Sequence, residues 1–314
     1  MDYAANMVKF FQAGMGAMVA LALAAVASSL AGDGARAEEP GGIERGAYLF
    51  AAGGCAGCHT DKASGGRVGA GGRGLKTPFG TFYGPNITPD PQTGIGSWSE
   101  ADFKAALRSG RAADGSNLFP AFPYTSFTFM RDEDIGYLWA YLRSLPPVRQ
   151  PNRAHDVSFP YNWRALVSVW KWFNFVPGPL LPDPTHDEDW NRGAYLARAL
   201  LHCGECHTPR NALGGLDGER AYGGTSAGPE GKKVPNITPD EETGLGHWSE
   251  SDVTTLLKIG LLPDGDVVGS LMGEVVENST SRLGDADRRA LAVYLRGLKP
   301  VSNPNAKATA AGWE

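Results

Sequence analysis

Two copies of the pattern Cys-x-x-Cys-His contain every cysteine of the 314-residue chain. The first copy is Cys55, Cys58 and His59, and the second is Cys203, Cys206 and His207. Two thiols three positions apart can reach the two vinyl groups of one porphyrin, and the adjacent imidazole is then placed to ligate the iron. The sequence therefore predicts two covalently attached haems of the c type and leaves no cysteine for a disulfide.

A redox dithiol or a zinc site is the alternative chemistry for a Cys-x-x-Cys pair. A four-cysteine zinc site would need both motifs to converge across roughly 145 residues, and it would leave both histidines without a role. The shared histidine therefore favours haem. A haem-free zinc-binding module stays a separate hypothesis, and it predicts a protein with no visible absorption.

An internal repeat surrounds the two motifs, which is evidence for two similar modules. The repeated segments are Arg-Gly-Ala-Tyr-Leu at 45–49 and 192–196, Pro-Asn-Ile-Thr-Pro-Asp at 85–90 and 235–240, and Trp-Ser-Glu at 98–100 and 248–250. Their order around the motif is the same in both halves. Each half is therefore predicted to be one haem module.

Three short helices are expected in each module. The first runs through Arg-Gly-Ala-Tyr-Leu into the haem motif. The second begins at Ser99 or Ser249, each followed three residues later by an aspartate in a capping-box pattern. The last has apolar residues at i, i+3, i+4 and i+7, and Pro146 or Pro300 follows it. The predicted fold is all-α, with two small haem domains in tandem.

The sixth iron ligand of each haem is expected to be methionine. Met272 is the candidate in the second module, where it precedes the last helix. Alignment of the two modules places Phe122 opposite Met272, so the candidate in the first module is Met130, eight residues further along. If Met130 is only a core residue, the first haem is five-coordinate or takes a histidine such as His155.

The rest of the chain completes the expected domain organisation. Residues 1–37 have the apolar run and the Ala35-Arg36-Ala37 pattern of a cleaved signal peptide, and an uncleaved membrane anchor is the alternative. The predicted parts are cytochrome domain 1 at 38–148, an aromatic and proline-rich interdomain strap at 149–188, domain 2 at 189–300 and a flexible tail at 301–314. The strap is expected to join the domains, with a partner-binding or membrane-resting surface as the alternative.

Composition fits an ordinary soluble globular protein. Hydrophobic residues make up 42% of the chain and charged residues 20%, and the formal net charge is -5. A negative net charge argues against nucleic acid as a partner.

These motifs together resemble a known family. The sequence is similar to the first two modules of the multi-haem cytochrome c subunits of periplasmic alcohol, aldehyde and gluconate-type dehydrogenases. The resemblance rests on Cys-Gly-Glu-Cys-His-Thr-Pro-Arg at 203–210, on Phe-Pro-Ala-Phe-Pro-Tyr at 119–124 and on the repeated segments. It implies cytochrome c-like domains and methionine ligation by Met272. Phe122 departs from the pattern, since several relatives have methionine there.

The function that this resemblance implies is electron transfer in the periplasm. The chain would take single electrons from a periplasmic dehydrogenase and pass them to a cytochrome, an oxidase or another respiratory acceptor. It would not itself be an enzyme, and it would touch a membrane only through an uncleaved N-terminal segment or a partner. The alternative is a dihaem enzyme of thiosulfate-oxidising or peroxidase-like type, in which haem 1 is open or unusually ligated.

Overall fold

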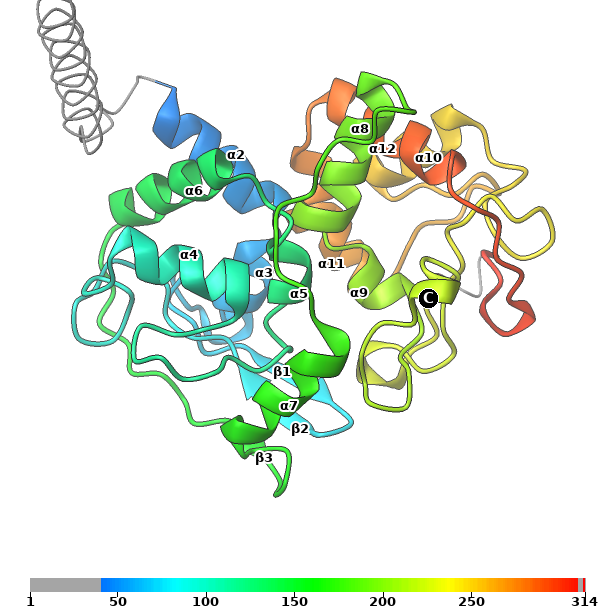
Figure 1. Ribbon diagram of the computed structural model, residues 1–314. Coiled ribbons are helices and arrows are strands. Elements are labelled where there is room, and N and C mark those ends of the chain that lie inside the picture. Colours follow the sequence, from blue (N-terminus) through cyan, green and yellow to red (C-terminus); the bar gives the residue numbers. More distant parts are fainter. Residues whose placement is uncertain (1–40, 310–312, 314) are drawn as a thin grey trace, which may run out of the picture. The chain divides into compact units, whose positions relative to one another are not determined.

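The computed structural model describes residues 41–309 and Trp313. Over this part the chain is mainly α-helical, with three short strands (Figure 1). The predicted signal peptide, residues 1–37, lies outside the described residues. No helix within the described part is both long enough and apolar enough to cross a membrane.

Two closely packed helix pairs organise the N-terminal half (residues 42–148) and the C-terminal half (residues 188–309). The pairs are α2 (Gly42–Ala52) with α6 (Asp132–Ser144), and α8 (Glu188–Tyr195) with α12 (Asp285–Arg296) (Figure 1). In each pair a glycine lies where the two helices are in close contact. A Cβ on Gly46 would lie 2.1 Å from the carbonyl oxygen of Tyr137, and one on Gly193 would lie 2.0 Å from that of Ala290. Only glycine lets the two backbones approach so closely.

The second helix of each half begins as its sequence predicts. In α4 (Glu100–Ser109) the Ser99 hydroxyl accepts a bond from the Asp102 N–H, and the Asp102 carboxylate accepts one from the Ser99 N–H. The same capping box forms between Ser249 and Asp252 at the start of α10 (Glu250–Ile259). Both helix starts are therefore confirmed, and each is stabilised by two satisfied backbone donors.

The expectation of one continuous helix through each haem motif is wrong. Helix α2 ends at Ala52, Gly54 has a left-handed φ of 62°, and Cys55–His59 form a separate helix, α3. In the C-terminal half, α8 continues as a π-helical segment, η2 (Leu196–Leu200), before the second motif begins. Helix α9 (Gly204–His207) then holds Cys206 and His207. Each motif is thus a short turn set apart from the helix that precedes it.

A small antiparallel sheet accompanies the N-terminal half, although the sequence analysis predicted no strand. Its strands are β1 (Gly74–Thr77), β2 (Gly80–Tyr83) and β3 (Asp156–Val157), in the order β1-β2-β3. Thr77 pairs with Gly80, so Pro78 and Phe79 form a two-residue hairpin loop. Helix α7 (Arg164–Asn174) covers the sheet through Val167, which joins Phe82 in a small separate core.

The main hydrophobic core is continuous between the two halves. It includes Leu49 and Leu138 from the N-terminal half and Leu200 and Leu291 from the C-terminal half. The remaining short elements are α5 (Tyr124–Phe127), α11 (Ser270–Asn278), η1 (Lys62–Ser64), η3 (Gly218–Arg220), η4 (Pro229–Gly231), η5 (Thr280–Arg282) and η6 (Pro304–Ala306).

Two buried asparagines hold the chain segments that follow the last helix of each half. The side-chain amide of Asn86 donates to the Val148 carbonyl at 2.7 Å, and that of Asn236 donates to the Val301 carbonyl at 2.6 Å. Asn236 also donates its backbone N–H to the carbonyl of Ala306, a residue without solvent exposure. Residues 301–309, expected as part of a flexible tail, are therefore packed against the C-terminal half.

The segment 149–188 makes contacts with both halves. Gly178 donates its N–H to the Thr128 hydroxyl at 2.9 Å, and the Trp170 indole donates to the Leu213 carbonyl at 2.9 Å. Several of its apolar side chains nevertheless face solvent: Phe159, Tyr161, Trp163, Val169, Trp172, Phe173, Val176 and Leu181. Trp172 is the most exposed of these, at 84%.

Candidate functional site

The two motif histidines share one hydrogen-bonding arrangement. The Nδ1 atom of His59 lies 2.8 Å from the carbonyl oxygen of Pro85, and that of His207 lies 2.8 Å from the carbonyl oxygen of Pro235. A carbonyl only accepts, so each Nδ1 carries the proton and each Nε2 keeps a free lone pair. Burial lowers the pKa of His207 to about 4 and also lowers the pKa of His59, so both rings are neutral. A neutral imidazole with its other nitrogen held by a carbonyl is the form that ligates iron.

Two glycines hold the main chain of these histidines. Gly71 donates its N–H to the His59 carbonyl at 2.8 Å, and Gly224 donates to the His207 carbonyl at 2.7 Å. Both glycines have left-handed φ angles, 81° and 73°, and a Cβ on Gly71 would lie 2.6 Å from the Asn86 nitrogen. The sequence analysis missed these glycines and the proline carbonyls. The repeated Pro-Asn-Ile-Thr-Pro-Asp segment was the available indication of the proline carbonyls, since it contains Pro85 and Pro235.

The four thiols are unpaired, and all four cysteines are partly buried. Burial raises the pKa of Cys55 and of Cys203 to about 12, and that of Cys206 to about 11. The thiolate is the form that attacks disulfides and binds zinc, so these surroundings disfavour the dithiol and zinc alternatives. Among residues 41–309, no three or more His, Cys, Asp or Glu side chains gather as a metal site.

An arginine anchors each motif at the same position, the residue before its second cysteine. Arg73 donates from Nη1 to the Gly57 carbonyl at 2.9 Å. Arg210 donates from Nη2 to the Glu205 carbonyl at 2.9 Å. These bonds fix the orientation of the turn that carries the thiols.

The candidate sixth ligands lie in different surroundings. Met130 is fully buried just before α6, and its carbonyl accepts a bond from Arg108 at 2.8 Å. Met272 lies in α11 and is partly buried against the main core. Phe122, its counterpart in the first half, packs with its ring centroid 5.5 Å from that of Phe127. Both methionine assignments stay predictions.

His155 is poorly suited to ligate iron. Its Nδ1 accepts the backbone N–H of Tyr83 at 3.1 Å, so the neutral ring carries its proton on Nε2. Its ring also packs against Phe82 and Phe119 beside the small sheet. Neither ring nitrogen has a free lone pair in this arrangement.

Trp313 provides a further test of whether a haem fits the second site. Its ring centroid lies 6.1 Å from that of His207 and 6.0 Å from that of Trp248. Its indole Nε1 is buried and has no hydrogen-bond partner among the described residues. A buried donor without a partner costs about 1–3 kcal/mol, and a haem propionate is an acceptor that would satisfy it. The thiols, the neutral imidazole and this donor together fit a covalent haem.

Comparison with known proteins agrees with this chemistry. The family model described as Cytochrome c matches residues 43–146. A dihaem c-type cytochrome of Cereibacter sphaeroides is 44% identical over 83% of this chain and 87% of its own length. The fructose dehydrogenase cytochrome subunit of Gluconobacter japonicus is 40% identical over 82% of this chain, and the cytochrome c subunit of the quinone alcohol dehydrogenase of Gluconacetobacter polyoxogenes is 41% identical over 82%.

The chain belongs to the c-type cytochromes, whose cofactor is covalently bound haem c. Its relatives include the cytochrome subunits of quinone alcohol, fructose and gluconate dehydrogenases. The chain spans 52% of the fructose dehydrogenase subunit and 56% of the alcohol dehydrogenase subunit. The resemblance stated from the motifs is therefore confirmed.

Proposed function

We propose that this chain is a periplasmic dihaem cytochrome c, with two haem modules in tandem joined by the strap at 149–188. One haem would be attached at Cys55 and Cys58 with His59 as ligand, and the other at Cys203 and Cys206 with His207 as ligand. The observation that carries the proposal is the recurrence of one site: a neutral imidazole whose Nδ1 lies 2.8 Å from a proline carbonyl, in a motif with two unpaired thiols.

Haem iron supplies one-electron redox chemistry when it is bound. The chain's own residues hold and orient its ligands: the Pro85 and Pro235 carbonyls set the imidazole rings, and Arg73 and Arg210 set the turns that carry the thiols. Met130 and Met272 are the proposed second protein ligands of the two haem irons.

Electron transfer with a dehydrogenase partner is supported by the relatives, which are named as cytochrome subunits of dehydrogenases. We propose that electrons enter from such a dehydrogenase, pass between the two haems and leave to a cytochrome, an oxidase or another respiratory acceptor. The signal-peptide pattern of residues 1–37 supports export to the periplasm. Mass spectrometry of the mature chain would show whether cleavage follows Ala37.

The test is haem stoichiometry in the exported full chain. Haem content and intact mass of the wild type should correspond to two haems per chain. The double variants Cys55→Ala/Cys58→Ala and Cys203→Ala/Cys206→Ala should each keep one. A wild type with one haem, or with colour that acid extraction removes, would refute the proposal. Turnover of thiosulfate or hydrogen peroxide would instead support the dihaem enzyme.

A further inference from the structure

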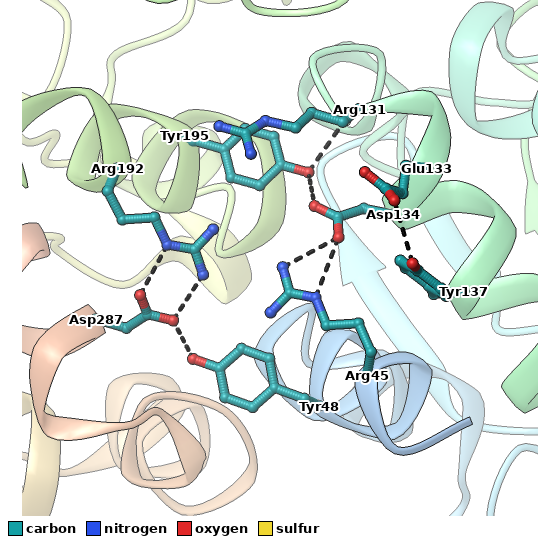
Figure 2. Close-up of polar contacts among 9 residues, drawn as sticks. All are labelled: Arg45, Tyr48, Arg131, Glu133, Asp134, Tyr137, Arg192, Tyr195 and Asp287. Carbon is teal, nitrogen blue, oxygen red and sulfur yellow. Dashed lines mark hydrogen bonds and ion pairs between the residues drawn. The ribbon is translucent and has the colours of Figure 1, made fainter. Parts of the chain in front are cut away.

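Each half of the molecule has one ion pair between its own helices, and a tyrosine from the other half donates to the aspartate of that pair (Figure 2). In the first, Arg45 of α2 donates to one carboxylate oxygen of Asp134 of α6, from Nε at 3.2 Å and from Nη2 at 3.0 Å. Tyr195 of α8 donates its hydroxyl to the other oxygen of Asp134 at 2.5 Å. The Asp134 carboxylate therefore joins two helices of its own half to one of the other.

The second ion pair repeats this arrangement with the halves exchanged. Arg192 of α8 donates from Nε and Nη2 to the two carboxylate oxygens of Asp287 of α12, both at 2.7 Å. Tyr48 of α2 donates its hydroxyl to Asp287 (Figure 2). The tyrosine and the arginine of each Arg-Gly-Ala-Tyr-Leu segment thus serve different ion pairs.

The aspartates of both ion pairs are more shielded from water than the arginines, which are 33% and 22% exposed. The Asp134 side chain is 6% exposed and the Asp287 side chain 17%. Burial and the hydrogen bond to Asp287 raise the pKa of Tyr48 to about 12, and burial with Asp134 raises the pKa of Tyr195. Both hydroxyls therefore stay protonated donors at neutral pH. Hydrogen bonds to charged groups are stronger than bonds between neutral ones.

Each tyrosine stands on the helix that leads to a haem motif. Tyr48 precedes Cys55 by seven residues, and Tyr195 precedes Cys203 by eight. A change in the tilt of α2 or α8 therefore moves the attachment point that follows it.

The motifs themselves also touch the opposite half. Arg73, which holds the first motif, pairs with Glu274 of α11 at 2.7 Å. Glu205, within the second motif, accepts a hydrogen bond from Thr125 of α5 at 2.5 Å. The Ser279 hydroxyl donates to the Ala52 carbonyl at 2.6 Å, at the end of α2. The surroundings of each attachment turn are therefore linked to the opposite half.

We propose that Tyr48 and Tyr195 are positioning residues for electron transfer between the two haems. Each hydroxyl donates to the aspartate of the opposite half. This bond holds the helix that carries the tyrosine, and that helix positions the attachment motif that follows it. Because tunnelling slows steeply with distance, the spacing of the motifs sets how fast an electron passes between them. This inference rests on the proposed function, since it requires a haem at each motif.

The experiment uses the full chain with its haems and the variants Tyr48→Phe, Tyr195→Phe and the double variant. Phenylalanine keeps the ring and removes only the hydroxyl. Tyr137→Phe is the control, because it also removes a tyrosine hydroxyl that donates to a carboxylate, here that of Glu133 at 3.1 Å (Figure 2). The measurements are the rate of electron redistribution between haems after partial photoreduction, the iron-to-iron distance by pulsed electron paramagnetic resonance, and both midpoint potentials.

The double variant loses two hydrogen bonds to carboxylates, one from each helix that leads to a haem motif. We expect inter-haem transfer to slow by about tenfold in the double variant, and less in each single variant. The distance distribution should broaden while the potentials and the Tyr137→Phe control stay as in wild type. An unchanged rate and an unchanged distance in the folded double variant would overturn the positioning role. If the double variant does not fold, the same result in both single variants would overturn it. A wild type without a second haem would refute the proposed function instead.

Discussion

Replacing Gly46 by alanine tests the helix crossing that carries the first haem motif. The added Cβ would lie 2.1 Å from the Tyr137 carbonyl oxygen and 2.6 Å from the Tyr141 Cβ. A carbon and a carbonyl oxygen in contact are normally about 3.3–3.6 Å apart. Because the obstacle is backbone, it cannot rotate away, and α2 must move from α6 by about 1 Å or more.

Two opposing effects decide how much Gly46→Ala changes the free energy of unfolding. Alanine is favoured over glycine inside a helix by up to about 1 kcal/mol, whereas overpacking of this kind costs about 1–3 kcal/mol. With a clash against backbone, we expect the upper end of that cost, so the net loss of unfolding free energy is about 2 kcal/mol. The corresponding decrease in Tm is about 5 °C. Gly193→Ala should behave alike, since its Cβ would lie 2.0 Å from the Ala290 carbonyl oxygen.

Chemical denaturation of the haem-loaded chain, followed by circular dichroism and by haem absorption, measures the effect. Gly136→Ala is the matched control, because Gly136 lies inside α6 and its Cβ would meet only a Glu100 carboxylate oxygen at 3.4 Å. That variant should be as stable as wild type, or more stable by up to about 1 kcal/mol. If Gly46→Ala matches or exceeds wild type in stability, the reasoning about the crossing is wrong.

Three further predictions concern the ligands, the acid stability and the exposed face of α7. Met272→Ala and Met130→Ala should each remove the low-spin methionine features of one haem from the absorption spectrum, and an unchanged Met130→Ala spectrum would reject that ligand. Burial by itself raises the pKa of Asp287, but its hydrogen bonds outweigh burial and hold this pKa below its ordinary value. Asp287 therefore contributes stability above about pH 4 that is lost as the pH falls. Asp287→Asn should flatten the decrease in unfolding free energy that denaturation measures between pH 7 and pH 3. Parallel curves for wild type and variant would contradict this. Trp172→Ala, at a side chain 84% exposed, should change the unfolding free energy by less than about 0.5 kcal/mol, whereas Val167→Ala, 6% exposed, should lower it by more than about 1 kcal/mol; equal effects in denaturation would contradict the assignment of the two faces.

Local patterns in the sequence were sufficient to locate several helices. The capping boxes at Ser99 and Ser249 depend on residues three positions apart, and both are present. The apolar spacing of the last helix of the N-terminal half likewise identifies its buried side, since Ile135, Leu138 and Leu142 are all in the core. Helix starts and amphipathic faces are properties of neighbouring residues, so they can be read without knowing the fold.

Contacts between distant residues could not be found in this way. Asp134 is 89 residues from Arg45 and 61 from Tyr195, and nothing in the sequence indicated that these three meet. The Pro85 and Pro235 carbonyls were equally hidden, because a backbone atom acts through its place in the fold and any residue type carries one. The break at Gly53 and Gly54 was visible as a glycine pair but was overlooked in favour of one long helix.

The exchanged tyrosines make the contact between the two halves symmetric in its residues. Their contacts follow the rule of a self-complementary interface, in which residue i of one copy meets residue j of the other and the reverse also holds. Each aspartate therefore serves both halves at once: replacing Asp134 or Asp287 removes the partner of an arginine in its own half and the acceptor of a tyrosine in the other half.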